Sequence, residues 1–514
     1  MTFLALPSHW PRQMIQGRQT TVMRRTHIKD EHCVRPSYCF SDDYQQVPCT
    51  IGRVTIDVLS DDVLMRIIQH IFGFYRQKSR DDYAIYSWRD KHAFKLVHVC
   101  QRWRNIVFAW PNHLDVQVDC NSVIAIARAL DVWPALPISV QSTLGRRSRD
   151  ANNIIAALEQ RERIAGIDFI DLSGPQLENC AELMQGPFPI LRTLTLGCDA
   201  EIPPVISDTF LGGSAHHLRE VNLYNVPFPA LPRLLLSAHS LVELHIENIP
   251  STGYISPEEI ATCLAVSTRL RSLIIDFQSS RSFPQNQSNQ HPPPMTHAVL
   301  PHLTTFVFSG VSEYLEDLMA RIDVPILNNL HLQFFRWPII GIPQLPQIIH
   351  RNENLKLAFT MPAMVHFYKD SIGISLSFPD NGSLRLDFQC AGLDNQLSLL
   401  KELYPQCSPL LSHINHLELF DHKMQTEHST LWLEFLRPFN AVETLGFWEP
   451  DSLKQVARVL GELSEERAAE VLPMLDTIIF FTMTIWDGVE PSSTPLLQPF
   501  IDARQLSGHP VVMH

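Results

Sequence analysis

A short apolar phrase recurs along most of this 514-residue chain and restricts what the chain can fold into. The phrase has the form L-x-x-L-x-L, with other aliphatic or aromatic residues allowed at the L positions. Its last two apolar positions are two residues apart, which is the period of a β-strand with one buried face. Copies begin at Leu191, Leu218, Leu241, Leu270, Leu303, Leu327, Ile414, Val442 and Leu475.

Successive phrases are spaced more widely than usual, roughly 23–33 residues apart against about 20–29 in leucine-rich repeats. Stacked phrases predict neighbouring parallel strands in chain order, backed by helices and loops. The clearest backing helix covers Asp451–Leu472, before Pro473. Cys198, Asn225 and Asn248 each come two residues after the last core position of a phrase. In the usual leucine-rich repeat the Asn or Cys comes three residues after it, so we expect irregular turns here. The fold class is therefore α/β, a leucine-rich-repeat-like solenoid over residues 161–514, with its least regular repeats at 336–410.

Three further segments differ from the repeats in composition. Residues 1–50 lack sustained periodicity and are predicted to be a disordered arm. Residues 116–160 are interpreted as a helical linker or capping segment. Residues 279–296 combine a Gln/Asn-rich run with three prolines, which indicates a low-complexity loop bulging from the solenoid.

Two amphipathic helical patterns precede the repeats, within residues 51–115. Ser60 is a good N-cap, and apolar residues then recur with helical period from Val63 to Phe72. A second stripe runs from Leu96 to Val107. Neither pattern is large enough to fold around a core of its own, which is typical of a docking module. Periodicity alone leaves open whether these helices bind a partner or pack on the first repeats.

These two patterns resemble a known module. The stretch Ile56–Leu64, together with Leu96–Arg104, is similar to an F-box, and closest to the F-box proteins with leucine-rich repeats of mushroom-forming fungi. Phrases at 132–137, 210–215 and 311–318 also resemble that group, so the likeness covers roughly residues 54–450. Two features depart from the pattern: the usual Leu-Pro opening is Leu59-Ser60, and a polar insert at about 76–87 separates the helices.

The resemblance implies a short all-helical F-box at 51–115 that docks on a Skp-type adaptor and through it on a cullin. The repeats would then hold a protein substrate near a ubiquitin donor, in the cytoplasm, the nucleus or both. An alternative is an interaction scaffold whose F-box is not coupled to ubiquitination. The residues expected to bind the adaptor are Leu59, Val63, Leu64, Ile67, Ile71, Leu96, Val99, Cys100 and Trp103.

Alternation along the predicted strands directs a second set of side chains to the concave face, where a substrate would bind. The early half of this face is acidic and the late half aromatic. A second interpretation is that residues 496–512 cover Trp448 and Phe481. The expected substrate-binding residues are Glu220, Tyr224, Glu243, His245, Glu247, Asp276, Phe420, Trp448 and Phe481.

Composition argues against other classes of function. A net charge of −13 disfavours nucleic acid as the main partner, and no apolar run reaches the ~18–20 residues that cross a membrane. The ten cysteines form no C-x-x-C pair, which favours reduced thiols inside the cell. His32, Cys33, Cys39 and Cys49 come nearest to a metal cluster, but their spacing is irregular. No catalytic motif is present, so we expect no enzyme, cofactor or metal.

Overall fold

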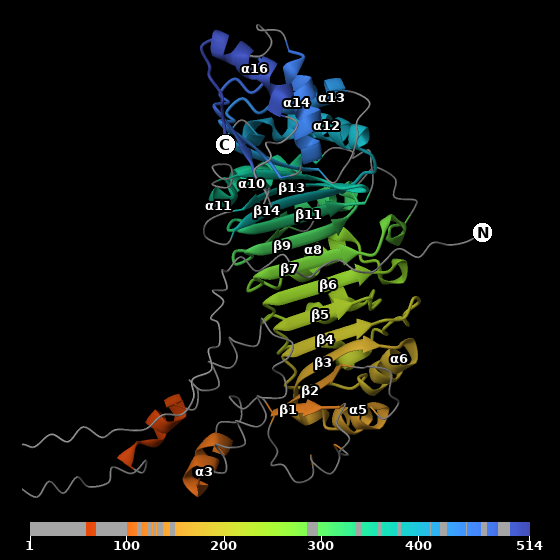
Figure 1. Cartoon of the computed structure of the whole chain (residues 1–514). Coiled ribbons are helices and arrows are strands. Elements are labelled where there is room, and N and C mark those ends of the chain that lie inside the picture. The colour runs from red at the N-terminus through yellow and green to blue at the C-terminus, as the bar shows by residue number, and fades with distance from the viewer. Residues whose placement is uncertain are drawn as a thin grey trace, which may run out of the picture. The chain divides into compact units, whose positions relative to one another are not determined.

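A sheet of mostly parallel strands is the main feature of the computed structural model (Figure 1). Residues 1–60 and 61–514 form separate units, and the sheet belongs to the second. The structure describes residues 58–67, 100–109, 116–120, 126, 130, 137–143, 150–284, 297–335, 342–356, 362–377, 382–411, 413–421, 429–448, 450–463, 470–481 and 494–514.

The large sheet contains 16 of the described strands, and neighbouring strands follow one another along it in nearly the order of the chain. Its order is β1-β2-β3-β4-β5-β6-β7-β9-β11-β14-β13-β12-β15-β16-β17-β18. The first nine are β1 (Val116–Asp119), β2 (Ile138–Thr143), β3 (Ile164–Leu172), β4 (Thr193–Cys198), β5 (Glu220–Tyr224), β6 (Glu243–Ile249), β7 (Ser272–Phe277), β9 (Thr305–Gly310) and β11 (Asn329–Phe334). The others are β12 (Ala363–Phe367), β13 (Ser371–Ser377), β14 (Ser383–Gln389), β15 (His416–Asp421), β16 (Thr444–Phe447), β17 (Thr477–Phe480) and β18 (Val512–Met513).

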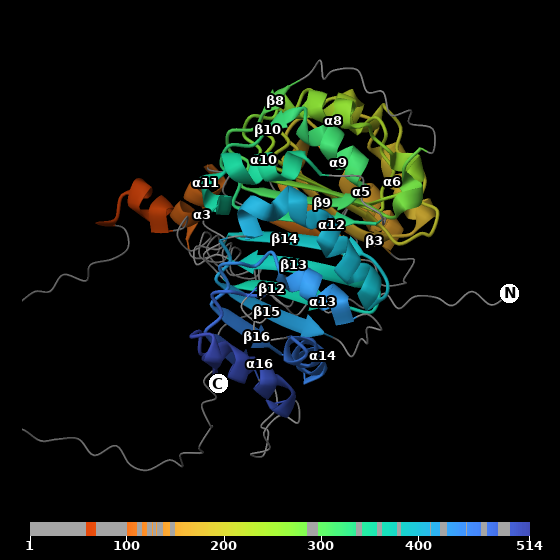
Figure 2. The same ribbon diagram turned by 90° about the horizontal axis from the view of Figure 1, so that it is seen from above.

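The helices that connect the strands lie on one face of this sheet (Figure 2). They are α5 (Asp150–Leu158), α6 (Gly174–Leu183), α7 (Leu231–Leu235), α8 (Pro257–Leu264), α9 (Ser312–Met319), α10 (Gln344–Arg351), α11 (Glu353–Lys356), α12 (Leu393–Leu411), α13 (Ser429–Leu436), α14 (Pro450–Gly461) and α16 (Thr494–Leu506). A separate pair of short strands, β8 (Ala298–Val299) and β10 (Ile322–Asp323), lies beside them. We call the opposite face of the large sheet the open face.

The apolar phrases form the strands because an extended chain places alternate side chains on one face, where they can be buried together. In β4, Leu194 and Leu196 are both only 1% exposed, whereas Thr193 and Thr195 between them are half-buried. Leu194 lies opposite Val221 of β5 in a parallel ladder. The predicted adjacency of these strands is confirmed, and burial of each such side chain contributes roughly 1.5–3 kcal/mol.

Left-handed backbone occurs at one asparagine directly after β5 and at another near the end of β6. Asn225 has φ 52° and Asn248 has φ 55°, a conformation that asparagine tolerates better than most residues. The Asn225 side chain is buried, and its Nδ2 donates to the carbonyl oxygens of Cys198 at 3.0 Å and Ala200 at 2.9 Å. Asn225 thereby satisfies backbone groups of the preceding turn.

The expectation of parallel strands in chain order is wrong for β12, β13 and β14. The chain leaves β11, enters β12 at a distance from it, and returns through β13 and β14, which pairs with β11. β13 is antiparallel to both of its neighbours. This segment lies within the predicted irregular region 336–410. Residues 369 and 370 form a tight link because the Tyr368 amide donates to the Ser371 carbonyl at 2.9 Å.

The sheet also begins earlier than the repeat phrases indicated. Residues 116–160, expected to be a helical linker or cap, contain β1 and β2 as well as α5, and Ile126 and Leu130 between the two strands are helical. β2 is parallel to β3, with a register shift after Ile138. The disordered arm predicted at 1–50 lies outside the described residues. So do residues 285–296 of the predicted loop, but Phe283 before them packs 4.4 Å from Phe277 between ring centroids.

Glu316 on α9 makes the stability of this unit depend on pH. Both of its carboxylate oxygens lie 3.2 Å from the Gln344 amide nitrogen at the start of α10, and burial raises the pKa of Glu316 to about 7. A carboxyl whose pKa is higher in the folded state stabilises less as pH rises from about 4.5 to 7. Glu316→Gln is therefore expected to stabilise the fold by about 1 kcal/mol at pH 8, after allowing for solvent screening.

The same substitution should have almost no effect at pH 4.5, where both side chains are neutral. Urea unfolding of the two proteins at both pH values measures this difference. An equal effect at the two pH values would contradict the assignment to the Glu316 carboxyl.

Candidate functional site

Five aromatic rings stack in a row on the open face, across β12, β15, β16 and β17. Their centroids are 5.8 Å apart for Tyr368–His366, 4.2 Å for His366–Phe420, 4.9 Å for Phe420–Trp448 and 4.6 Å for Trp448–Phe481. The interplanar angles lie between 6° and 21°. We call this row the aromatic ladder.

The ladder follows directly from strand register. His366 lies opposite Phe420 in the parallel pairing of β12 with β15. Trp448 and Phe481 come one residue after β16 and β17, and their amides continue the pairing by donating to the carbonyls of Leu419 and Phe447. Because each inner ring is covered on both faces by its neighbours, the ladder offers ring edges and its two outer faces to a partner.

A buried carboxylate fixes the Trp448 ring. Trp448 Nε1 donates to Glu418 Oε2 at 2.7 Å, and Glu418 is only 5% exposed. His416 Nε2 lies 3.4 Å from the other oxygen of Glu418. At Gly446, a Cβ would lie 2.7 Å from the Phe481 ring, so glycine provides the space that this ring occupies. The ladder is thus held in place before any partner binds.

Sequence reasoning named three of these rings, Phe420, Trp448 and Phe481, as substrate-binding candidates, and the structure brings them together. It missed His366 and Tyr368, which lie where no L-x-x-L-x-L phrase is present. The available signal was the alternation of Ala363, Val365 and Phe367, whose side chains are all buried while those between them are half-buried.

The acidic candidates lie on the open face of β5, β6 and β7. Glu220 is in register with Glu243, and Tyr224, which is 54% exposed, is in register with Glu247. His245 Nε2 lies 2.8 Å from the Ser272 hydroxyl, and burial lowers the pKa of His245, so it adds no positive charge at pH 7. Burial also raises the pKa of Asp276.

A charged cluster separates the acidic strands from the ladder. Asp387 on β14 lies 2.7 Å from His331 Nε2, and it accepts a 2.7 Å hydrogen bond from Arg385 Nε. Burial alone would raise the pKa of Asp387, but hydrogen bonds from His331 and Arg385 bring it below its usual range. The open face therefore has three parts along the sheet: acidic, mixed and aromatic.

The F-box-like residues contribute two described helical pieces. Residues 61–67 are helical, and α3 spans Gln101–Ala109. Asp61 Oδ1 accepts hydrogen bonds from Arg102 Nε at 2.9 Å and Nη2 at 2.7 Å, which joins the pieces. Leu64 and Trp103 are buried.

The other predicted adaptor residues differ in exposure. Val63 is 42% exposed and Ile67 is 39% exposed. Because they are four residues apart on a helix, these two side chains share a face. Leu59 and Cys100 are half-buried, and Ile71, Leu96 and Val99 lie outside the described residues.

No group of three or more His, Cys, Asp or Glu side chains in the described ranges could hold a metal ion. Burial raises the pKa of both Cys180 and Cys263 to about 12, so neither forms the thiolate that a nucleophile requires. Among these same residues, every helix is too short or too polar to cross a bilayer.

Comparison with known proteins gives limited further information. No family model and no curated protein matches the chain. The leucine-rich repeat-containing protein LegL7 from Legionella pneumophila is similar in structure over 78% of this chain and 99% of that chain, with 13% sequence identity and a TM-score of 0.27. At that TM-score the likeness carries no argument. The fold is therefore assigned from strand order and register. It is a mixed α/β structure with a large, mostly parallel sheet, as in leucine-rich-repeat solenoids.

Proposed function

We propose that this chain is the substrate-recognition subunit of a Skp–cullin–F-box type ubiquitin ligase. The observation that carries the proposal is the F-box-like pair of segments, in which an ion pair joins residues 61–67 to α3 while apolar side chains remain exposed. Leu64 and Trp103 are buried, whereas Val63 and Ile67 are exposed on the helix face that would contact an adaptor. Exposed apolar side chains that share one helix face commonly mark such a contact.

The repeats would supply the second half of this function. An open face with a preorganised aromatic ladder and an acidic region suits a protein substrate that has apolar and basic groups. Holding that substrate near a ubiquitin donor raises the reaction rate through proximity and orientation, so the chain itself needs no catalytic group.

An alternative proposal is an interaction scaffold whose F-box is not coupled to ubiquitination. The polar insert at about 76–87 favours this alternative, because it is longer than the segment between the helices of compact F-boxes. The open face would then bind its partner in the same way, but no adaptor or cullin would accompany the complex.

Affinity capture with the proteasome blocked distinguishes the two proposals. The intact chain is expected to capture a Skp-type adaptor, a cullin and a substrate, whereas a chain without residues 54–110 keeps only the substrate. Capture of a substrate without adaptor or cullin by the intact chain would support the scaffold and contradict the ligase.

Replacement of Trp448 by alanine tests the ladder. Large, fixed aromatic rings dominate many interfaces, so Trp448→Ala is expected to reduce substrate capture at least tenfold while adaptor capture stays unchanged. Leu236→Ala is the matched control and should leave substrate capture unchanged, because Leu236 is an exposed apolar residue directly after α7, on the helix side of the sheet. Full substrate capture by a folded Trp448→Ala chain would show that the ladder is not the substrate site.

A further inference from the structure

The turns that lead into the early strands carry an exposed row of arginines. In each of these turns the amide of the anchoring residue donates to the carbonyl three residues earlier, as Leu218 does to Ala215 at 3.2 Å. The residue after the anchor is Arg192 before β4, Arg219 before β5 and Arg271 before β7, and all three are exposed. We call these three residues the arginine row.

Backbone hydrogen bonds place the arginines of this row side by side. The amide of Arg219 donates to the carbonyl of Arg192 at 2.7 Å, so these two residues lie on neighbouring strands. The Arg271 amide donates to the Val242 carbonyl at 2.8 Å, and the Val242 amide donates to the Arg219 carbonyl at 2.7 Å. Because neighbouring strands are about 4.8 Å apart, the row is about 14 Å long.

Further basic side chains lie beside the row, two residues earlier in the turns. Arg269 is exposed, and the exposed His217 and His302 occupy the same position in the turns before β5 and β9. Within the described ranges, no ion pair involves Arg219, Arg269 or Arg271. These three guanidinium groups therefore have no ion-pairing role inside the described fold.

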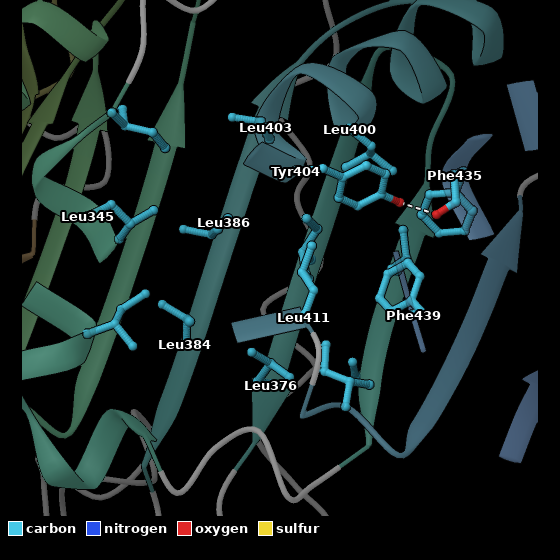
Figure 3. Close-up of a pocket in the computed structure, with 16 residues that line it drawn as sticks. Leu345, Leu376, Leu384, Leu386, Leu400, Leu403, Tyr404, Leu411, Phe435 and Phe439 are labelled. Atoms are coloured by element: carbon cyan, nitrogen blue, oxygen red, sulfur yellow. Dashed lines mark hydrogen bonds between the residues drawn. The ribbon is translucent and has the colours of Figure 1, made fainter. Parts of the chain in front are cut away.

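The fold does not require arginine at these positions. The late repeats use the same turn, in which the Leu475 amide donates to the Leu472 carbonyl at 3.0 Å. There the residue after the anchor is Glu443 before β16 and Asp476 before β17. The early turns are separated from the late ones by β12, β13 and β14, the region drawn in Figure 3. One backbone position is thus basic early in the sheet and acidic late in it, which favours a binding role for the arginines.

The charge and width of this surface determine which partner fits it. Glu220 and Glu243 begin β5 and β6 directly beside the arginine row, so the positive strip is narrow. Nucleic acid carries a phosphate about every 3.4 Å along each strand, and its phosphates would also lie against these carboxylates. An extended peptide has side chains on one face about 6.6 Å apart, so three acidic residues at alternate positions span about 13 Å. That span is close to the length of the row.

We propose that the arginine row binds an extended acidic segment of a partner protein, in which Asp or Glu alternates with neutral residues. Each carboxylate would accept hydrogen bonds from one guanidinium group, whose planar set of donors matches carboxylate geometry. The row lies outside the F-box-like segments and the aromatic ladder, so this proposal does not depend on the ligase function.

Fluorescence anisotropy of a labelled peptide of alternating Glu and Ser, titrated with the full chain, tests the proposal. The wild type is expected to bind this peptide. Arg219→Glu/Arg271→Glu should bind it at least tenfold more weakly, because both substitutions replace attraction by repulsion. Arg219→Gln/Arg271→Gln, which adds no negative charge to the turns, should also weaken binding.

Arg233→Glu/Arg458→Glu is the matched control. Both of its arginines are exposed, on α7 and α14 of the helix side, and the net charge changes by the same four units. Its affinity should stay within about twofold of the wild type at 0.15 M salt, because charges farther than about 8 Å are largely screened.

A labelled oligothymidylate is the second probe and should bind more weakly than the peptide. Tighter binding of the oligothymidylate would overturn the proposal in favour of nucleic acid. Failure of the wild type to bind the peptide, or equal losses of affinity in the Arg219/Arg271 and Arg233/Arg458 glutamate variants, would also overturn it.

Discussion

A chain in which Val63 and Ile67 are both replaced by aspartate is expected to bind a Skp-type adaptor at least 100-fold more weakly. These side chains are 42% and 39% exposed and share one helix face, so the substitutions introduce charge where apolar contact is required. The large sheet should unfold at an unchanged temperature, because neither residue belongs to its core. Pull-down of purified adaptor, with circular dichroism of the same samples, measures both properties.

Arg66→Asp is the matched control for this variant. Arg66 is exposed on the same helix, and the substitution changes the net charge by the same two units as the double variant. It should retain most of the adaptor binding. Equal binding by the wild type and the Val63/Ile67 double variant would refute the docking face. Leu64→Asp is less informative, because Leu64 is fully buried and its loss would also unfold the helix pair.

Replacement of Gln396 by alanine is expected to destabilise the sheet by about 3 kcal/mol. Gln396 is fully buried at the start of α12, and its Nε2 donates to the carbonyl oxygens of Tyr368 at 2.7 Å, Ser371 at 3.1 Å and Cys390 at 2.7 Å. These carbonyls belong to the β12–β13 turn and the end of β14. Without the amide, the carbonyls of Tyr368 and Cys390 lose this donor, at about 1–3 kcal/mol each before relaxation, whereas the Ser371 carbonyl still accepts from the Tyr368 amide.

The adjacent residue provides the control. Asn395 also donates its side-chain amide to a carbonyl, that of Ala391 at 2.9 Å, but it is exposed to water. Asn395→Ala should therefore change stability by no more than about 0.5 kcal/mol. Urea unfolding of both variants checks the difference, and similar losses at the two positions would show that the three-carbonyl contact is not what stabilises this turn.

Much of the sheet could be predicted from the sequence because its pattern is local. In the repeats, one anchoring leucine and two alternating apolar residues specify both a strand and its buried face. The same alternation placed Phe420, Trp448 and Phe481 on one face, where they do stack. The stacking itself depends on register, on Glu418 and on Gly446, which no single phrase contains.

The sequence also contains a pattern that indicates the change of strand direction at β12–β14, although this pattern differs from the repeat phrase. Ile372, Ile374 and Leu376 alternate with small residues, and Asn381-Gly382 follows, a dipeptide that strongly favours a hairpin. A search for parallel repeats alone does not detect this segment. That search therefore missed His366 and Tyr368, and it could not predict that three consecutive strands share their backing helices.

Helical periodicity could not predict which of the F-box-like residues are exposed, for a different reason. A helical stripe identifies the apolar side, but which members are buried depends on the neighbouring helix. Here the hydrogen bond from Arg102 to Asp61 joins that neighbour to residues 61–67. Leu64 is buried, and Val63 and Ile67 are exposed.

Isothermal titration calorimetry of the purified full-length chain with a purified Skp-type adaptor tests the central claim most directly. The account predicts a 1:1 complex with a Kd below about 1 µM and a negative heat-capacity change from apolar burial. The Val63/Ile67 double aspartate variant should give no measurable heat of binding. A folded wild-type chain that releases no heat with the adaptor, or a double variant that binds as tightly as the wild type, would contradict it.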